Sequence, residues 1–278
     1  MSTNRKVQQL ASDRPTLQFT KRTGELFRTQ GMPSFLRLRP RKPGPIAVWL
    51  RQMLDAEKTA TRVWDLPTRL FHWTLATTVV ALVVTAKVGG NAMEWHMRLG
   101  LLVLGLLVFR VLWGLVGGRW SRFAAFIYSP ATVLRYLRGQ SRPDEHLDVG
   151  HNPLGSFSVF AVLGLLAVQV GTGLVADDEI ATLGPLNKLV ATETGLLATS
   201  WHKSWGQWLI LALVALHVVA IIVYQWRKKD LLRPMWVGDR LLPAGTPASA
   251  DGVRQRLLAL ALALASGACV AWVVRLGA

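Results

Sequence analysis

Residues 201–226 read WHKSWGQWLILALVALHVVAIIVYQW, and this stretch decides the fold. After Lys203 it holds no charged residue. A helix needs roughly 20 mostly apolar residues to cross a hydrocarbon layer about 30 Å thick, and this stretch is long enough. It also carries His202 and His217, and ionisable side chains inside a bilayer are costly, which makes them candidates for function. The stretch therefore predicts a transmembrane helix that carries a functional site.

Four further stretches have the same apolar character, at about Leu70–Val88, Leu99–Val116, Pro153–Ala176 and Leu257–Val274. Only 17% of the 278 residues are charged, below the roughly 25% of an average soluble protein. The sequence therefore predicts an all-α integral membrane protein. Four spans form a transmembrane bundle, and a fifth C-terminal transmembrane helix follows them.

The net charge of +16 lies between the spans rather than along one soluble face. Residues 1–64 carry 13 Lys and Arg against 4 Asp and Glu, whereas residues 176–200 carry four acidic residues and only Lys188 as a base. Basic connections stay in the cytoplasm. We therefore expect a bacterial inner-membrane protein with a cytoplasmic N-terminus and a periplasmic C-terminus. Its partner is the lipid bilayer, and nucleic acid is excluded.

Three regions follow from this pattern. Residues 1–62 hold no apolar run and are rich in Arg and Pro, so we expect a basic, disordered arm or one that lies on anionic lipid. Another reading is that the natural start is Met53. Residues 63–240 form the membrane domain, and residues 241–278 form a linker and the additional transmembrane helix. No residue before Asp65 is expected to pack in the bundle.

Four histidines fall in or beside the spans, and the expected topology sorts them by depth. His202 and His217 are 15 residues apart, about 22 Å along a helix, and four turns take about 14.4 residues, so both rings face one side. His72 and His217 then lie near the cytoplasmic face, and we call them the inner pair. His96 and His202 lie near the periplasmic face as the outer pair.

Two histidine pairs at two depths predict two bis-histidine haems stacked in a four-helix haem-binding bundle. Iron with two axial imidazoles has no open position, so it exchanges electrons. Gly100 and Gly206 each lie four residues after a histidine of the outer pair, where a missing side chain leaves room for a porphyrin. The single cysteine, Cys269, excludes cysteine-ligated clusters and covalent haem attachment. Isolated core histidines are the alternative interpretation.

His151 lies just before the third span and could replace His72 as a ligand. The other interpretation is that it bonds a haem propionate, a quinone head group or a backbone carbonyl. Candidate propionate partners at the membrane edges are Arg69, Arg98 and Lys203, although each of these could simply reach for lipid headgroups. Arg110 lies too deep in the second span for that explanation.

Several motifs in order resemble the bacterial cytochrome b-561 / nickel-hydrogenase di-haem b-type cytochrome family. They are Val63–Trp73 (VWDLPTRLFHW), His96-x-x-x-Gly100, Arg110-x-x-Trp113-Gly114, Gly150–Gly155 (GHNPLG) and Trp201-His202 with His217-Val218. The resemblance covers about Val63 to Arg240. It implies two haem b groups with ligands at His72, His96, His202 and His217. The chain departs from the family in its basic arm, its fifth span, and one additional residue between His202 and His217.

The resemblance also implies electron exchange between the quinone pool and a redox partner, either a hydrogenase or a periplasmic c-type cytochrome. We therefore expect an electron-transfer subunit of an oxidoreductase complex. One alternative is a self-sufficient quinol-oxidising oxidoreductase, and another is an anchor subunit with structural haems. A histidine-lined membrane transporter is the alternative of another class. It would need carboxylates deep in the spans, and the sequence has none there.

Overall fold

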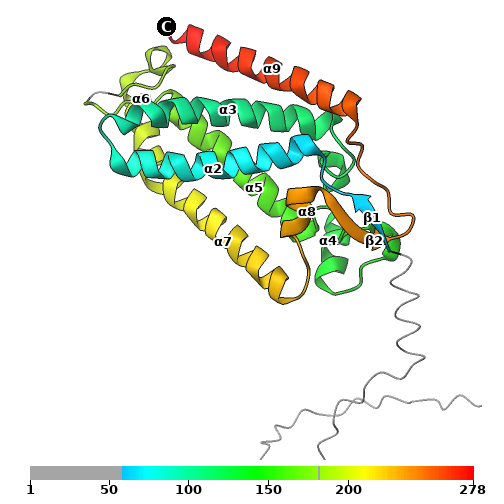
Figure 1. Ribbon diagram of the computed structural model, residues 1–278. Coiled ribbons are helices and arrows are strands. Elements are labelled where there is room, and N and C mark those ends of the chain that lie inside the picture. The colour runs from blue at the N-terminus through cyan, green and yellow to red at the C-terminus, as the bar shows by residue number, and fades with distance from the viewer. Residues whose placement is uncertain (1–57, 181) are drawn as a thin grey trace, which may run out of the picture. The chain divides into compact units, whose positions relative to one another are not determined.

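The first transmembrane helix begins where the sequence provides a cap. In the computed structural model, which describes residues 58–180 and 182–278, helix α2 runs Leu66–Val88 (Figure 1). Asp65 precedes it in extended backbone and accepts a hydrogen bond from Thr68 N at 2.8 Å, with Pro67 in the first turn. Asn152 caps helix α5 (Pro153–Leu174) in the same way, and its side chain accepts from Gly155 N at 2.7 Å. Both caps satisfy N–H groups that a helix leaves without a partner.

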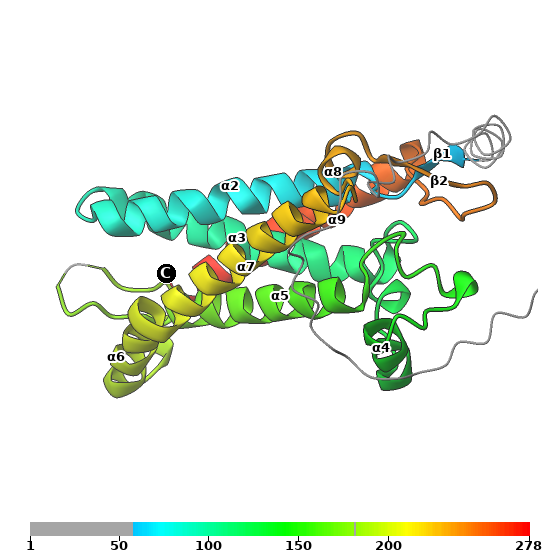
Figure 2. The same cartoon turned by 90° about the horizontal axis from the view of Figure 1, so that it is seen from below.

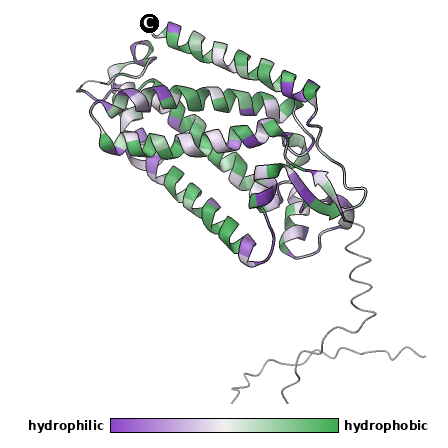
Figure 3. Cartoon of the chain, in the orientation of Figure 1, coloured by the Kyte–Doolittle hydropathy of each residue, from purple (hydrophilic) through white to green (hydrophobic). Residues whose placement is uncertain are grey.

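Within the described residues, five helices are long and apolar enough to cross a membrane, which confirms the predicted spans. They are α2, α3 (Ala92–Val116), α5 (Pro153–Leu174), the continuous helix Thr192–Trp226 and α9 (Val253–Leu276). The fourth consists of α6 (Thr192–Trp201), a π-helical turn (His202–Gly206) and α7 (Gln207–Trp226). Figure 3 shows hydrophobic colouring along these helices and hydrophilic colouring in the connections. The chain therefore spans a membrane several times.

Helix α3 lies in the middle of the bundle and packs against α2, α5 and α9. Val103 and Leu107 of α3 meet Leu166 of α5 in one buried cluster. Helix α7 packs against α5, and Figures 1 and 2 show it crossing the bundle at an angle. Helix α9 lies along α3, with Ala259 in the cluster of Phe109 and Trp113. The fifth span therefore packs against the four-helix core.

One end of the bundle carries a two-stranded antiparallel ribbon, which we call the ribbon end. Strand β1 (Lys58–Arg62) pairs with β2 (Asp239–Pro243), with Arg62 opposite Asp239. The short helices α4 (Pro130–Leu137) and α8 (Leu232–Val237) lie at the same end (Figure 1). The helical turns at 123–125, 143–145 and 187–189 complete the regular structure of the described residues.

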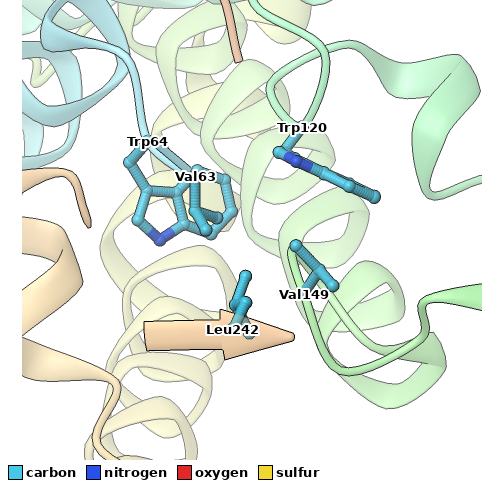
Figure 4. Packing of buried hydrophobic residues seen from close by; sticks show 5 residues of the cluster. All are labelled: Val63, Trp64, Trp120, Val149 and Leu242. Atoms are coloured by element: carbon cyan, nitrogen blue, oxygen red, sulfur yellow. The ribbon is translucent and has the colours of Figure 1, made fainter. Parts of the chain in front are cut away.

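The expected boundary of the basic arm is wrong at its C-terminal end. Residues 58–62 form β1, and Val63 and Trp64 are buried against Trp120, Val149 and Leu242 (Figure 4). The ribbon also crosses the expected boundary between residues 240 and 241. Burial of this apolar cluster stabilises the ribbon because an isolated pair of strands is marginal in water. The rest of the predicted arm, residues 1–57, lies outside the described residues.

Candidate functional site

The inner pair joins the first and fourth spans. His72 lies in the second turn of α2, and its ring centre is 6.4 Å from that of His217 on α7, with the ring planes at 52°. The ring of His72 also packs against Trp73, while His217 is exposed. His72 Nδ1 is buried and has no hydrogen-bond partner among the described residues. The two rings therefore face each other across a narrow separation.

The outer pair joins the second and fourth spans at the opposite end of the bundle. The ring centres of His96 and His202 are 6.1 Å apart, and their planes are nearly perpendicular at 80°. Each Nδ1 lies against a backbone carbonyl, His96 at 3.0 Å from Leu82 O and His202 at 2.9 Å from Gln169 O. A carbonyl only accepts, so Nδ1 carries the proton and Nε2 keeps its lone pair. Both outer histidines are thereby prepared as metal ligands.

Both separations fit one metal ion bound between two imidazoles. With metal–nitrogen bonds of about 2.0 Å on opposite sides, the two ring centres would lie about 6 Å apart. Among residues 58–180 and 182–278, no group of three or more His, Cys, Asp or Glu side chains could hold a metal. Two protein ligands do not complete a tetrahedral site, whereas a porphyrin supplies the four equatorial nitrogens itself. The donor set therefore fits haem better than a bare cation.

The two glycines that were expected to make room for a porphyrin differ. Nothing lies within 4 Å of a Cβ built on Gly100, so the face of α3 beside His96 is open, as expected. A Cβ on Gly206 would instead overlap Oε1 of Gln169 from α5. The expectation for Gly206 is therefore wrong, because a neighbouring side chain takes up the space that this glycine leaves.

His151 does not join the inner pair by ring contact. Its ring packs between Trp64, 4.8 Å between centres, and Phe126, 4.6 Å. Tyr128 donates a hydrogen bond to its backbone oxygen at 2.6 Å, and its Nδ1 is buried without a partner. Burial, and after it the positive charge of Arg110, lower the pKa of His151 to about 3. The ring is therefore neutral at physiological pH and retains hydrogen-bonding capacity.

The basic residues near the pairs fall into two groups. Arg98 forms an ion pair with Glu94, and Lys203 is exposed, so both face the surroundings of the bundle. Arg69 donates to the backbone oxygen of Trp236. Arg110 is only 3% exposed, stacks over the ring of Phe123 at 4.6 Å, and has a buried Nη1 without a described partner. Arg110 is thus the buried cation at the depth of His72.

The 15-residue spacing between His202 and His217 includes the wide turn at His202–Gly206. A π turn bonds each residue to the fifth one along rather than the fourth and so takes up one residue more than an α turn. The 15-residue spacing then advances like 14 α-helical residues, close to four turns. The sequence signal was the odd spacing, but Gln169, which contacts this turn, gave no signal beyond being polar within an apolar span.

Comparison with known proteins adds the family to this geometry. Residues 63–238 match the family described as prokaryotic cytochrome b561. A "Probable Ni/Fe-hydrogenase B-type cytochrome subunit" of Cupriavidus necator is 29% identical over 197 residues, covering 59% of this chain and 79% of that protein. The "Probable Ni/Fe-hydrogenase 1 B-type cytochrome subunit" of Escherichia coli K12 is 26% identical over 190 residues, covering 56% and 80%. A corresponding subunit of Rhizobium leguminosarum is 24% identical over 223 residues, covering 66% and 90%. No solved structure matches significantly. The matched residues include both histidine pairs and end before α9, and on this basis the chain belongs to the prokaryotic cytochrome b561 family of helical membrane proteins.

Proposed function

We propose that this chain is the electron-transferring cytochrome subunit of a hydrogenase complex and holds two b-type haems. The inner haem lies between His72 and His217, and the outer one between His96 and His202. Membership of a cytochrome b family and relatives named as hydrogenase subunits support this proposal. The observation that carries it is the recurrence of one ring separation, 6.4 and 6.1 Å, at two ends of one bundle.

Each haem, when bound, supplies reversible exchange of one electron. The two imidazoles of each pair would hold it, and they would leave no position open for a small molecule. His202 and His217 are about 22 Å apart along the fourth span, which is most of an apolar layer about 30 Å thick. An electron that passes between the two sites therefore crosses most of the membrane.

Arg110 is the residue that we assign to the carboxylates of the inner haem. A buried guanidinium needs several acceptors as well as an attractive charge such as that of Asp65, and its Nη1 has no hydrogen-bond partner among the described residues. Arg98 lies beside His96 at the outer pair, and Glu94 already neutralises it. We propose that one of the two sites exchanges electrons with membrane quinone and the other with the hydrogenase. We also place the chain in the bacterial inner membrane, with the ribbon end in the cytoplasm because of its basic connections.

The test is the haem content and redox titration of the purified full chain and of single His→Ala variants. The unmodified protein should hold two extractable haems with low-spin spectra of b type. His72→Ala and His217→Ala should damage one redox step, and His96→Ala and His202→Ala the other. His146→Ala, outside both pairs, is the matched control and should retain both steps.

Two results would contradict this assignment. A folded chain that stays colourless when haem is supplied during expression would remove the electron-transfer proposal altogether. Loss of the same step in His72→Ala and His202→Ala would refute the pairing. Loss of the inner step in His151→Ala, with that step intact in His72→Ala, would make His151 the ligand. Co-purification with hydrogenase subunits expressed beside this chain tests the partner, and its absence would favour a c-type cytochrome.

A further inference from the structure

Gln169 makes two separate contacts with His202. It lies on α5, and its Nε2 donates to the backbone oxygen of His202 at 2.8 Å. In return, His202 Nδ1 lies 2.9 Å from the backbone oxygen of Gln169. The amide nitrogen must be the atom facing His202 O, because a carbonyl oxygen only accepts. One residue therefore contacts both the backbone and the ring of His202.

The π turn makes the first of these contacts accessible. His202 is the first residue of the wide turn that ends at Gly206. A π turn disturbs the regular ladder of α-helical hydrogen bonds, and such turns occur often at functional sites. The side-chain amide of Gln169 enters from the neighbouring helix and supplies a donor to the carbonyl at this point. The acceptor that Gln169 uses therefore lies at the first residue of the π turn.

Gly206 makes room for the same amide. A Cβ at this position would overlap Gln169 Oε1 and would lie 3.1 Å from Trp201 Nε1. Gly206 is buried although it lies in a helix, where glycine is unfavourable by about 1 kcal/mol relative to alanine. A polar amide in a membrane span is also costly unless it is hydrogen-bonded. A helical glycine and a polar amide in a span are both unfavourable, and here they meet in one contact that fixes His202.

We infer that Gln169 is the positioning residue of the outer site. This inference rests on the proposed function. Gln169 acts through His202: its backbone oxygen keeps the proton on Nδ1 and directs Nε2 towards His96, and its side chain fixes the turn from which the ring projects. Thr172 Oγ1 lies 3.2 Å from the same Nδ1 and supports this orientation. The result is the nearly perpendicular arrangement of the outer rings, 80°, compared with 52° for the inner rings.

The ring angle gives a spectroscopic signature that a purely structural role would not move. Low-spin ferric haems with perpendicular axial imidazoles give more anisotropic paramagnetic resonance signals than those with parallel ones. Gln169→Leu removes the amide while keeping a side chain of similar size. We expect the outer signal and its redox step to shift, while the inner ones stay unchanged. Loss of a group that orients a metal ligand costs about 10- to 100-fold in metal affinity, so the outer haem should transfer to apomyoglobin correspondingly more readily.

Two further variants keep this test decisive. Gly206→Ala displaces the same amide from the other side while improving helix propensity, so it should reproduce the outer-site shift without loss of fold. Gln207→Leu is the matched control. It removes an amide on the residue directly after Gly206. The Oε1 of Gln207 accepts from Lys87 Nζ at 3.2 Å, and the variant should leave both histidine sites unchanged. An inner haem with its normal signal shows that each variant is folded.

The haem content of the unmodified chain is measured first. A single haem or none there would overturn the proposed function and this inference with it. Two haems in the unmodified chain, together with an outer signal in Gln169→Leu equal to that of Gln207→Leu, would overturn the positioning role alone. A shift of the inner signal instead of the outer one would also refute it.

Discussion

Replacing Asp65 by alanine should destabilise the ribbon end more than any change at a surface carboxylate. Asp65 is fully buried, and each of its two carboxylate oxygens accepts two hydrogen bonds. Oδ1 accepts from Thr68 N at 2.8 Å and from Trp113 Nε1 at 3.1 Å. Oδ2 accepts from Gly118 N at 3.2 Å and from Ser121 Oγ at 2.6 Å. One side chain therefore joins the start of α2 to the end of α3.

The magnitude follows from counting the donors that alanine would leave without an acceptor. Trp113 Nε1 keeps a second acceptor, Thr68 Oγ1, at 3.1 Å. The amides of Thr68 and Gly118 and the hydroxyl of Ser121 lose theirs. An unsatisfied buried donor costs about 1–3 kcal/mol, so three of them predict a loss of roughly 3–9 kcal/mol. Asp65→Asn keeps the helix cap but turns a donor towards Gly118 N, and it should cost about 1–3 kcal/mol.

The free energy of unfolding can be measured in mixed micelles with increasing SDS, followed by far-ultraviolet circular dichroism. Asp144→Ala is the control, because Asp144 is exposed in the connection between α3 and α5. It should change the free energy of unfolding by less than about 0.5 kcal/mol. A loss below about 1 kcal/mol for Asp65→Ala would refute the network. An equal loss for Asp65→Asn and Asp65→Ala would show that the charge matters and the number of acceptors does not.

Three further outcomes test separate parts of the molecule. Burial lowers the pKa of His151 from 6.5 to about 3, so the neutral ring contributes its full stabilisation above pH 6.5. Below pH 6.5 the free energy of unfolding falls with decreasing pH, by at most about 1.4 kcal/mol per pH unit. His151→Phe should remove this part of the slope, measured between pH 7 and pH 5. Gly114→Ala would place a Cβ on the ring of Phe123 and should cost about 1–3 kcal/mol, measured by thermal unfolding, and a neutral result would mean that the ring moves freely. Reporter fusions should place Gln140 in the cytoplasm and Asn187 in the periplasm, and finding both on one side would contradict the orientation.

The spans could be predicted because a bilayer demands long apolar runs, but the start of the second span could not. Helix α3 begins at Ala92 and includes Glu94 and Arg98, whose ion pair lets polar residues continue a helix beyond the apolar layer. The Asp65 cap was readable from its position before Pro67. The contacts of Asp65 with α3 and with the connection that follows it were not readable, because they join residues about 50 positions apart that no local pattern links.

The histidine pairs were predictable for a related reason. Depth in a membrane follows directly from position in a span, and helical periodicity gives the direction of the ring, so His202 and His217 could be assigned to two levels. The β ribbon could not be predicted, because its strands show little alternation and pair across most of the chain. Gln169 was missed because its role depends on an irregular turn in another helix.

The ribbon also has a consequence for the order in which the chain assembles. Residues 58 and 239 are separated by 181 positions, and everything between them includes the first four spans. At about 5–20 residues per second, roughly 9–36 s of synthesis separate the two strands. During that time β1 has no strand to pair with, and the apolar side chains of Val63 and Trp64 lack their contact with Leu242. The ribbon therefore closes only after the fourth transmembrane helix has been made, so its formation marks a bundle whose first four transmembrane helices are in place. Until then, this segment is open to chaperones.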